Sequence, residues 1–301
     1  MRKLFLLVFA SVLCILVYGQ QVTFNQMWMT STTGSSISHV YAVDSKQDAS
    51  GNLYYLGRMN NGTNNDAIVA KLNANGVVLW QQVYNSGAED NPVSMGVDNS
   101  GNVYAMMNRI VSGINKVRIV KYSSTGSIVW NNVFGGLAGS TINHGVVDGT
   151  GNVYITGYVY STSTLSVINT QKISNAGTSI WIGTYNSSGL LDQGKNVLVD
   201  AGLNVYVAGY SSGSTTNRNW TILKYNSTGV QQWVRSYDGV STLDEMATVL
   251  VLDNSSNIIV GGQSGGSAKI RKYTSAGTFQ WMDTQVVSNV SGGPILSVDN
   301  T

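Results

Sequence analysis

The chain has 301 residues, of which 34 are glycine, 2 are proline and 11% are charged, while 43% are hydrophobic. This apolar fraction excludes a disordered chain, and short runs rich in Val, Ile and Tyr between polar turns are typical of a soluble all-β protein. With 17 basic and 15 acidic residues the net charge is only +2, so the charge gives no argument for nucleic acid or an anionic membrane as a partner.

The N-terminal residues 1–19 differ from the rest of the chain. Arg2 and Lys3 precede an apolar run over residues 4–18, and small residues suited to cleavage end the segment. This order is typical of a secretory signal peptide, which leaves residues 20–301 as the mature domain. A retained membrane anchor is the alternative, although the run is short for a spanning helix. The single cysteine lies inside the signal segment, so we expect no disulfide in the mature chain.

The rest of the chain repeats one pattern five times, with steps of 50, 50, 52 and 53 residues between the five turn aspartates. Each copy contains an aspartate four residues before an asparagine: Asp48, Asp98, Asp148, Asp200 and Asp253. Farther along each copy, a lysine is followed by a glycine and then a tryptophan at constant spacing: Lys71 to Trp80, Lys121 to Trp130, Lys172 to Trp181, Lys224 to Trp233 and Lys272 to Trp281.

Each copy is predicted to form four short antiparallel strands. The first strand runs into the aspartate turn, as over 247–252, and the second follows the asparagine, as at Val153 and Tyr154. The third ends near the lysine, as over 117–122, and a glycine turn leads to a fourth strand that carries the tryptophan. Four strands per repeat of this length predict an all-β fold, a β-propeller with five complete blades, in which we expect each tryptophan to pack between neighbouring blades.

Both ends of the chain are predicted to hold partial blades. Residues 24–30 resemble an isolated fourth strand, and residues 294–299 resemble an isolated first strand. Such strands complete one another in a closed propeller, where they remove the open edges. We therefore expect a C-terminally truncated part of a protein with about six or seven blades. A natural stop codon directly after Thr301 would contradict this expectation.

Three copies of the repeat carry a resemblance to a known family. They are DGTGNVYITGY at 148–158, VRIVKYSSTGSIVW at 117–130 and WTILKYNSTGVQQW at 220–233. These segments resemble the bacterial β-propeller repeat called SBBP, and the resemblance covers about residues 28–300. It implies a secreted or cell-surface protein of Bacteroidetes-like bacteria, and it is specific for the repeat type, not for an activity. Three positions depart from the usual repeat: Met107, Leu203 and Ile259.

A set of carboxylates lies eight or nine residues before three of the turn aspartates: Asp90, Asp192 and Asp244, with Glu245 beside the last. This spacing places them in the connection between a fourth strand and the next first strand, where we expect the mouth of the central channel. Loops at one face of a scaffold commonly carry its function, so the set is the candidate ligand-binding site. Two interpretations stay open: the carboxylates form a site for a metal or a cationic ligand, or each aspartate caps the start of its own strand. One unit has no carboxylate at this place, which residues 140–143 occupy.

The repeated turn aspartates and lysines each allow two interpretations. The aspartate turn is similar to a calcium loop, but each turn has one carboxylate where such loops need several, so capping of the turn is favoured and calcium stays open as a cofactor. The repeated lysine is an anion-binding residue or, as we favour, a side chain that packs on the sheet and reaches a carboxylate or carbonyl.

The sequence offers little support for catalysis. The two histidines, His39 and His144, lie in different units, and no nucleophile elbow, zinc-binding helix motif or phosphate loop occurs. We therefore expect no catalytic residues and no metal ligands. Carboxylate pairs for glycoside hydrolysis stay open, because the sequence does not give their separation.

These observations favour a secreted or cell-surface, non-catalytic binding or scaffold module for extracellular protein or glycan. The alternatives are a hydrolase or lyase acting on extracellular polysaccharide, and a structural spacer in a larger surface protein. We expect a monomer without nucleic-acid partners and without a membrane span in the mature chain. Function is expected in the loops that vary between units: residues 60–66, 160–166 and 211–219.

Overall fold

The computed structural model describes residues 40–134, 139–160, 165–187, 191–212, 217–239, 244–283 and residue 296. The predicted signal peptide and the predicted strand at 24–30 lie outside the described residues, as does the strand at 294–299 apart from residue 296. The regular elements of the described ranges are strands, and no helix long and apolar enough to cross a membrane occurs among them.

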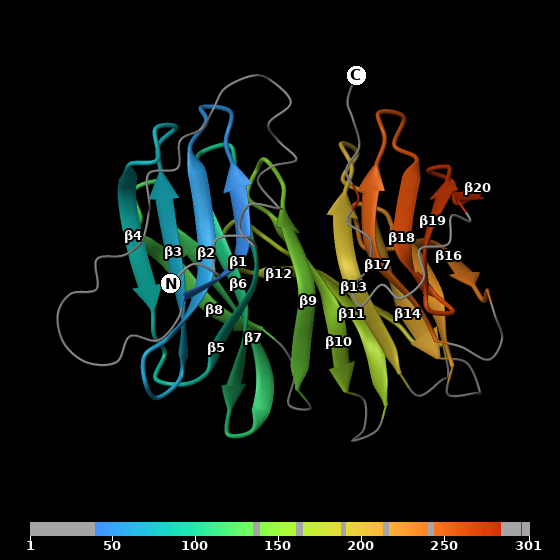
Figure 1. Ribbon diagram of the computed structural model, residues 1–301, viewed down its shortest axis with the longest axis horizontal. Helices are drawn as coiled ribbons and strands as arrows, with labels where there is room; N and C mark the ends of the chain where they lie inside the picture. The colour runs from blue at the N-terminus through green and yellow to red at the C-terminus, as the bar shows by residue number, and fades with distance from the viewer. Residues whose placement is uncertain are drawn as a thin grey trace.

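The strands form five antiparallel sheets of four strands each, with sequential neighbours paired (Figure 1). The first sheet contains β1 (Val40–Gln47), β2 (Leu53–Asn60), β3 (Asn65–Leu72) and β4 (Val78–Tyr84). The second contains β5 (Asp90–Val97), β6 (Val103–Val111), β7 (Ile114–Tyr122) and β8 (Ile128–Phe134). The third contains β9 (Ser140–Val147), β10 (Val153–Tyr160), β11 (Ser166–Ile173) and β12 (Ser179–Tyr185).

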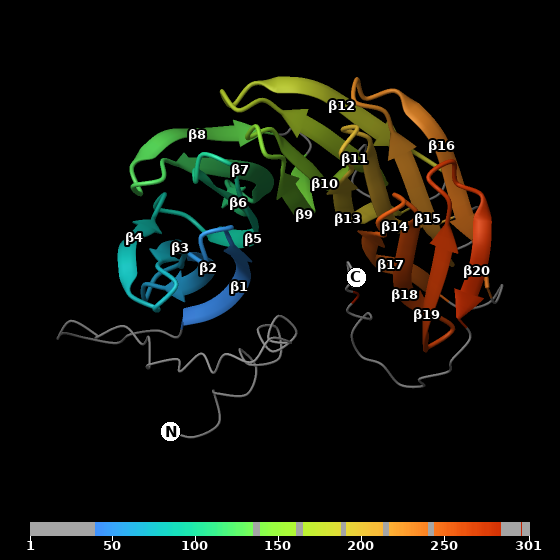
Figure 2. The same cartoon turned by 90° about the horizontal axis from the view of Figure 1, so that it is seen from above.

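The fourth sheet contains β13 (Asp192–Val199), β14 (Val205–Ser212), β15 (Arg218–Tyr225) and β16 (Gln231–Tyr237). The fifth contains β17 (Glu245–Leu252), β18 (Ile258–Ser264), β19 (Ser267–Tyr273) and β20 (Phe279–Asp283). The sheets follow one another in an arc, with β1, β5, β9, β13 and β17 on its inner side and the fourth strands on its outer side (Figure 2). The prediction of five complete propeller blades is therefore confirmed.

The hydrophobic core lies between neighbouring blades. Leu56 and Val69 of the first sheet, for example, belong to one buried cluster with Met95 and Val120 of the second. The second and third, third and fourth, and fourth and fifth sheets share clusters of the same kind. Because each sheet buries its faces against its neighbours, a single blade has no core of its own.

The repeated tryptophan bridges two blades, as predicted. Trp80 in β4 stacks on Tyr122 of the next blade with ring centroids 6.1 Å apart, and its Nε1 donates to the Ser124 carbonyl oxygen at 3.0 Å. A Cβ on Gly126 would lie within 3.0 Å of this indole, so a glycine is needed where the turn faces the tryptophan of the preceding blade. This steric requirement explains why the spacing of lysine, glycine and tryptophan is the same in every unit. The repeated tryptophans are nevertheless half-buried at the outer rim, or exposed in the case of Trp281.

The repeated lysine packs on a tyrosine of the second strand, in agreement with the structural interpretation. Lys121 Nζ lies 5.1 Å from the centroid of the Tyr104 ring, and the Tyr104 hydroxyl donates to Asp98 at 3.0 Å. The fifth blade has Ile259 in place of this tyrosine, and there Lys272 reaches the turn carboxylate of Asp253 directly at 2.7 Å. Without the tyrosine ring, the Lys272 ammonium pairs directly with the turn aspartate, which accepts a hydrogen bond from a tyrosine hydroxyl in a blade such as the second.

The aspartate turn requires a left-handed residue at its fourth position. Three blades use glycine there, with φ of 76° to 86°: Gly51, Gly101 and Gly151. Leu203 occupies the position in the fourth blade with φ 61°. A left-handed conformation costs an ordinary residue about 1–2 kcal/mol, and the greater freedom of glycine in the unfolded chain offsets part of that.

Replacing Leu203 with glycine is therefore expected to raise the free energy of unfolding by about 0.5–1 kcal/mol. Urea denaturation followed by circular dichroism measures the change. Ser256→Gly is a parallel variant, because Ser256 has φ 58° at the same position of the fifth blade. A lower midpoint for both variants would show that the turn does not store this strain.

Candidate functional site

The predicted channel-mouth carboxylates are buried at the start of the inner strands. Asp90, Asp192 and Glu245 are the first residues of β5, β13 and β17, and all three side chains are fully buried. Each accepts a backbone N–H from the connection that precedes its strand: Ser86 to Asp90 at 2.9 Å, Ser187 to Asp192 at 2.7 Å and Gly239 to Glu245 at 2.6 Å. Each carboxylate therefore caps the loop that leads into its own strand.

Asp244 occupies a different position from the other three carboxylates. The residue equivalent to Asp90 and Asp192 in the fifth blade is Glu245, whereas Asp244 precedes the strand and has a side chain that is 50% exposed. Ser140 fills the equivalent position in the third blade, where it is buried. The carboxylates therefore do not form an open ring, and Asp244 alone among them contributes to a surface.

The turn aspartates direct their oxygens to donors of their own turn. Asp148 accepts N–H groups of Thr150 and Asn152, the Asn152 amide and the Tyr154 hydroxyl at 2.9–3.1 Å. Within the described ranges, no three His, Cys, Asp or Glu side chains are grouped so that they could hold a metal ion. The turns are thus capped in the way that the sequence favoured.

The inner strands are linked by a repeated side-chain contact. Asp44 Oδ2 accepts the N–H of Met95 at 2.9 Å, Ser94 Oγ accepts that of Gly145 at 3.2 Å, and His144 Nδ1 accepts that of Val197 at 3.3 Å. Burial lowers the pKa of His144, which favours the neutral imidazole that can accept at Nδ1. His144 therefore joins two blades, while His39 lies outside the described residues.

A group of aromatic and basic side chains lies where the third and fourth blades meet; we call it the Tyr–Lys–Arg cluster. It comprises Tyr158, Tyr160, Lys195, Tyr210 and Arg218. The buried Tyr210 ring has Lys195 Nζ at 5.4 Å and the Arg218 guanidinium carbon at 4.8 Å from its centroid. Tyr158 and Tyr160 make an edge-to-face pair with centroids 5.4 Å apart. All members except Tyr210 are partly exposed.

Polar neighbours hold the two cations in place. Lys195 Nζ donates to Gln193 Oε1 at 2.9 Å, and Arg218 lies 3.6 Å from the Asp244 carboxylate. Burial, and then the charge of Arg218, lower the pKa of Lys195. Burial raises the pKa of Tyr210, with Arg218 acting against it and the phenols of Tyr158 and Tyr160 adding to it. Tyr210 therefore lies within electrostatic reach of Arg218, Tyr158 and Tyr160, and Lys195 lies within reach of Arg218.

Both cations occupy positions where the other blades have neutral residues. Lys195 is the bulged residue of its inner strand, and the bulges of the other blades carry Val43, Val93, Asn143 and Thr248. Arg218 lies six residues before the repeated lysine, a position filled elsewhere by Asn65, Asn115, Ser166 and Gly266. The cluster is thus absent from the repeat pattern, so the blade architecture does not require it.

The cluster also borders two of the loops in which the sequence predicted function. Tyr160 ends β10 and Arg218 begins β15, next to residues 161–164 and 213–216, which lie outside the described residues. Neither Lys195 nor Arg218 was predicted as a site residue, although Arg218 lies in the variable segment 211–219. Comparing the charge at each repeat position across the five units would have found them. Their proximity, however, depends on how β10, β13 and β15 pack.

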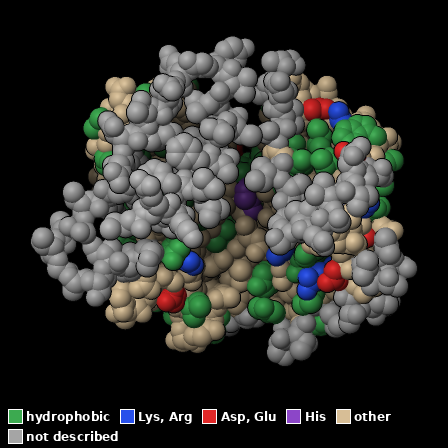
Figure 3. Space-filling view, viewed as in Figure 1, with side chains coloured by type: hydrophobic (Ala, Val, Ile, Leu, Met, Phe, Trp, Pro, Cys, Tyr) green, Lys and Arg blue, Asp and Glu red, His purple; other side chains and the backbone are tan. Residues whose placement is uncertain are grey.

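The face shown in Figure 3 is hollowed near its centre, and the visible lining is mostly uncharged polar side chain and backbone. Basic and acidic side chains gather beside it on the side of β13 to β17. Basic and acidic side chains are visible on the opposite side of the hollow as well.

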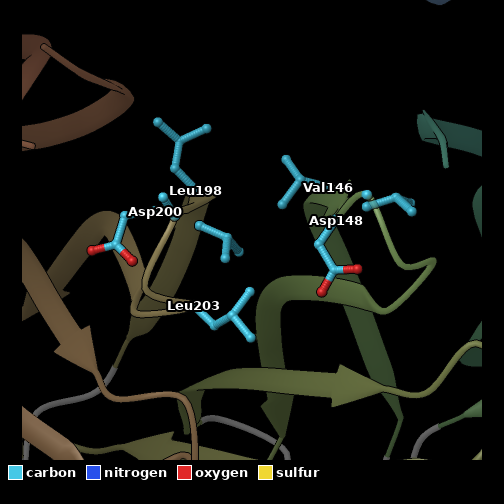
Figure 4. A pocket seen from close by; sticks show the side chains of 9 residues that line it. Val146, Asp148, Leu198, Asp200 and Leu203 are labelled. Atoms are coloured by element: carbon cyan, nitrogen blue, oxygen red, sulfur yellow. The ribbon is translucent and has the colours of Figure 1, made fainter. Parts of the chain in front are cut away.

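The opposite end of the inner strands holds an apolar groove of about 400 Å³ between the third and fourth blades. Val146 and Leu198 face each other across it, and Leu203 lies below them in the view of Figure 4. Asp148 and Asp200 border the groove, but their carboxylates point away from it into their own turns. The groove therefore offers no reactive group to a ligand.

Comparison with known proteins identifies the fold class. Neither a family model nor a curated protein matches the chain. Among solved structures, the chain is similar to puromycin hydrolase, with a TM-score of 0.51, 9% identity, and coverage of 81% of this chain and 38% of that one. It is also similar to the Synechocystis apocarotenoid oxygenase, with a TM-score of 0.50, 11% identity, and coverage of 87% and 65%.

Because the sequence identities are only 11% and 9%, the similarity to these two proteins shows the fold alone. With its five four-stranded sheets, the chain is a β-propeller protein, like puromycin hydrolase. It spans less than two thirds of either protein, namely 38% and 65% of their lengths.

Proposed function

We propose that this protein is a secreted or cell-surface β-propeller that acts as a non-catalytic binding module for an extracellular protein or glycan. The observation that carries the proposal is the contrast between recurrent and non-recurrent polar residues. The recurrent aspartates and lysines are engaged in contacts within a blade or with the next blade, whereas the Tyr–Lys–Arg cluster is partly exposed and occurs once. A binding site on a repeat scaffold needs such residues, because the repeat itself fulfils a structural role.

The cations and tyrosines of the cluster raise one alternative function, that of a polysaccharide lyase. Such an enzyme neutralises a uronate carboxylate with cations and removes the neighbouring proton with a base, which must ionise near the working pH. The buried phenol of Tyr210 has a raised pKa, which opposes its use as a base at neutral pH. A glycoside hydrolase needs two carboxyl groups, and Asp244 is the one carboxylate paired with the cluster in the part of the chain that the structure describes. Binding without turnover accords better with these groups.

A glycan array probed with the mature chain tests the proposal, together with product analysis for every polysaccharide bound. Saturable binding with unchanged ligand is the expected result. New reducing ends would identify a hydrolase, and new ultraviolet absorbance from an unsaturated sugar would identify a lyase. The absence of binding to the array and to extracellular proteins of the source cell would overturn the proposal in favour of a structural spacer.

A further inference from the structure

The Tyr–Lys–Arg cluster carries more positive charge than its surroundings neutralise. Lys195 donates to the neutral amide of Gln193, and no ion pair of Lys195 occurs within the described ranges. Among the described residues, Asp244 is the carboxylate that pairs with Arg218: one of its oxygens lies 3.6 Å from the guanidinium, and the other accepts the Arg218 backbone N–H at 3.1 Å. The Arg218 side chain is 30% exposed. Two cations beside one carboxylate leave a net positive charge that favours an anion.

The two cations lie within electrostatic reach of one another, since the charge of Arg218 lowers the pKa of Lys195. Both lie against the Tyr210 ring, at 5.4 Å and 4.8 Å from its centroid. An arginine fork binds a planar carboxylate through two parallel N–H donors, and a neighbouring lysine adds a point charge. Phosphate fits the same cations, but the aromatic residues beside them are better explained by a ligand with an apolar ring face.

Tyr158 and Tyr160 supply that aromatic surface. They lie in β10, their rings meet edge to face at 5.4 Å, and both are partly exposed. A tyrosine combines a flat apolar face with a hydroxyl that can exchange hydrogen bonds with a sugar hydroxyl. An acidic peptide would use the cations but would not require two adjacent phenols, so the arrangement favours a carbohydrate.

We infer that the Tyr–Lys–Arg cluster binds a uronic acid residue of an acidic polysaccharide. The carboxylate is bound by the cations of Arg218 and Lys195, and the sugar ring lies against Tyr158 and Tyr160. This inference rests on the proposed binding function and specifies its ligand. Its failure is distinguishable from failure of that function, because a module that binds a neutral glycan or a protein would lack this dependence on charge.

Matched ligands test the role of the carboxylate. Isothermal titration of the mature chain is carried out with polygalacturonate, alginate and the methyl ester of polygalacturonate, in which the sugar is kept and the charge removed. We expect polygalacturonate or alginate to bind and the ester to bind at least about 10-fold more weakly, since the ester loses the hydrogen bonds between a carboxylate and the two cations. Affinity should fall with added salt.

Matched variants test the location. Arg218→Asn and Lys195→Asn introduce residues that other blades carry at these positions, and each is expected to weaken binding by about 10-fold to 100-fold. Tyr160→Ser introduces the residue type that the fourth blade carries at the equivalent Ser212, and it should weaken binding to both the acid and the ester. Arg58→Asn is the control, because Arg58 also lies over a tyrosine, at 5.3 Å from the Tyr41 ring, but in the first blade. Thermal denaturation confirms that every variant is folded.

Several results would overturn the inference. They are equal affinity for the acid and its ester, unchanged affinity of Arg218→Asn and Lys195→Asn, loss of affinity in Arg58→Asn of the same size, or equally tight binding of polyglutamate. Absence of binding to both polyuronates would also overturn it. If a neutral glycan or a protein bound under the same conditions, the proposed function would stand while this ligand assignment fell.

Discussion

Replacing Trp220 with alanine is expected to lower the free energy of unfolding by about 3–5 kcal/mol. Trp220 is fully buried in β15, and its indole packs in a cluster formed by the fourth and fifth sheets. Its Nε1 donates to the Gln263 carbonyl oxygen at 2.8 Å, and its ring meets Tyr237 edge to face at 5.6 Å. The substitution would leave a cavity between two blades and an unpaired carbonyl.

Trp281→Ala is the matched control, because Trp281 is 44% exposed on an outer strand. It should cost about 1 kcal/mol, since the indole loses little buried area. Chemical denaturation followed by circular dichroism compares the two variants without depending on tryptophan fluorescence. Equal losses would show that the junction of the fourth and fifth blades is not packed around Trp220.

Replacing Asp148 with alanine is expected to cost about 2–3 kcal/mol at neutral pH, because the carboxylate accepts several hydrogen bonds that no other group replaces. One of its donors, the Tyr154 hydroxyl, belongs to a fully buried side chain. Burial acts to raise the pKa of Asp148, but hydrogen bonds from Asn152, Thr150 and Tyr154 outweigh it and lower the pKa from 3.8. The folded state therefore favours the ionised form.

This pKa shift gives the pH dependence of the effect. Because the folded-state pKa lies below the unfolded value of about 3.9, the stabilisation is complete above that value. It disappears as the pH falls through the lower folded-state pKa. The difference in unfolding free energy between wild type and Asp148→Ala should therefore shrink in acid. Urea titrations at a series of pH values measure it.

Asp238→Ala serves as the control for this series. Asp238 is exposed after β16, so its removal should change the unfolding free energy by less than about 0.5 kcal/mol at every pH. An effect of Asp148→Ala that is independent of pH would contradict the proposed role of the ionised carboxylate.

Much of the blade was predictable because its causes are local. The aspartate turn depends on hydrogen bonds within five residues, as between Asp98 and Asn102, and on a left-handed residue such as Gly101. The constant spacing from lysine to tryptophan follows from a hairpin that places Trp80 against Gly126 of the next blade. Such constraints recur in every unit, so a single sequence displays them five times.

The position of the carboxylates relative to the surface was not predictable in the same way. Spacing grouped Asp244 with Asp90 and Asp192, but pairing in the sheet places Glu245 at their position and leaves Asp244 beside Arg218. A shift of one residue exchanges a buried side chain for an exposed one, because alternate residues of a strand face opposite sides. The length of the preceding connection, which varies between units, decides that register.

The sequence by itself determined the repeat, the four-stranded blade and the structural roles of the repeated aspartate, lysine and tryptophan, because each depends on neighbours along the chain or on the identical unit beside it. Only the tertiary structure decided that Lys195 and Arg218 lie on one tyrosine ring and that Trp220 fills a junction between blades. Those contacts join residues that occur once, and their distances depend on the angle at which two twisted sheets pack. No spacing in the sequence encodes that angle.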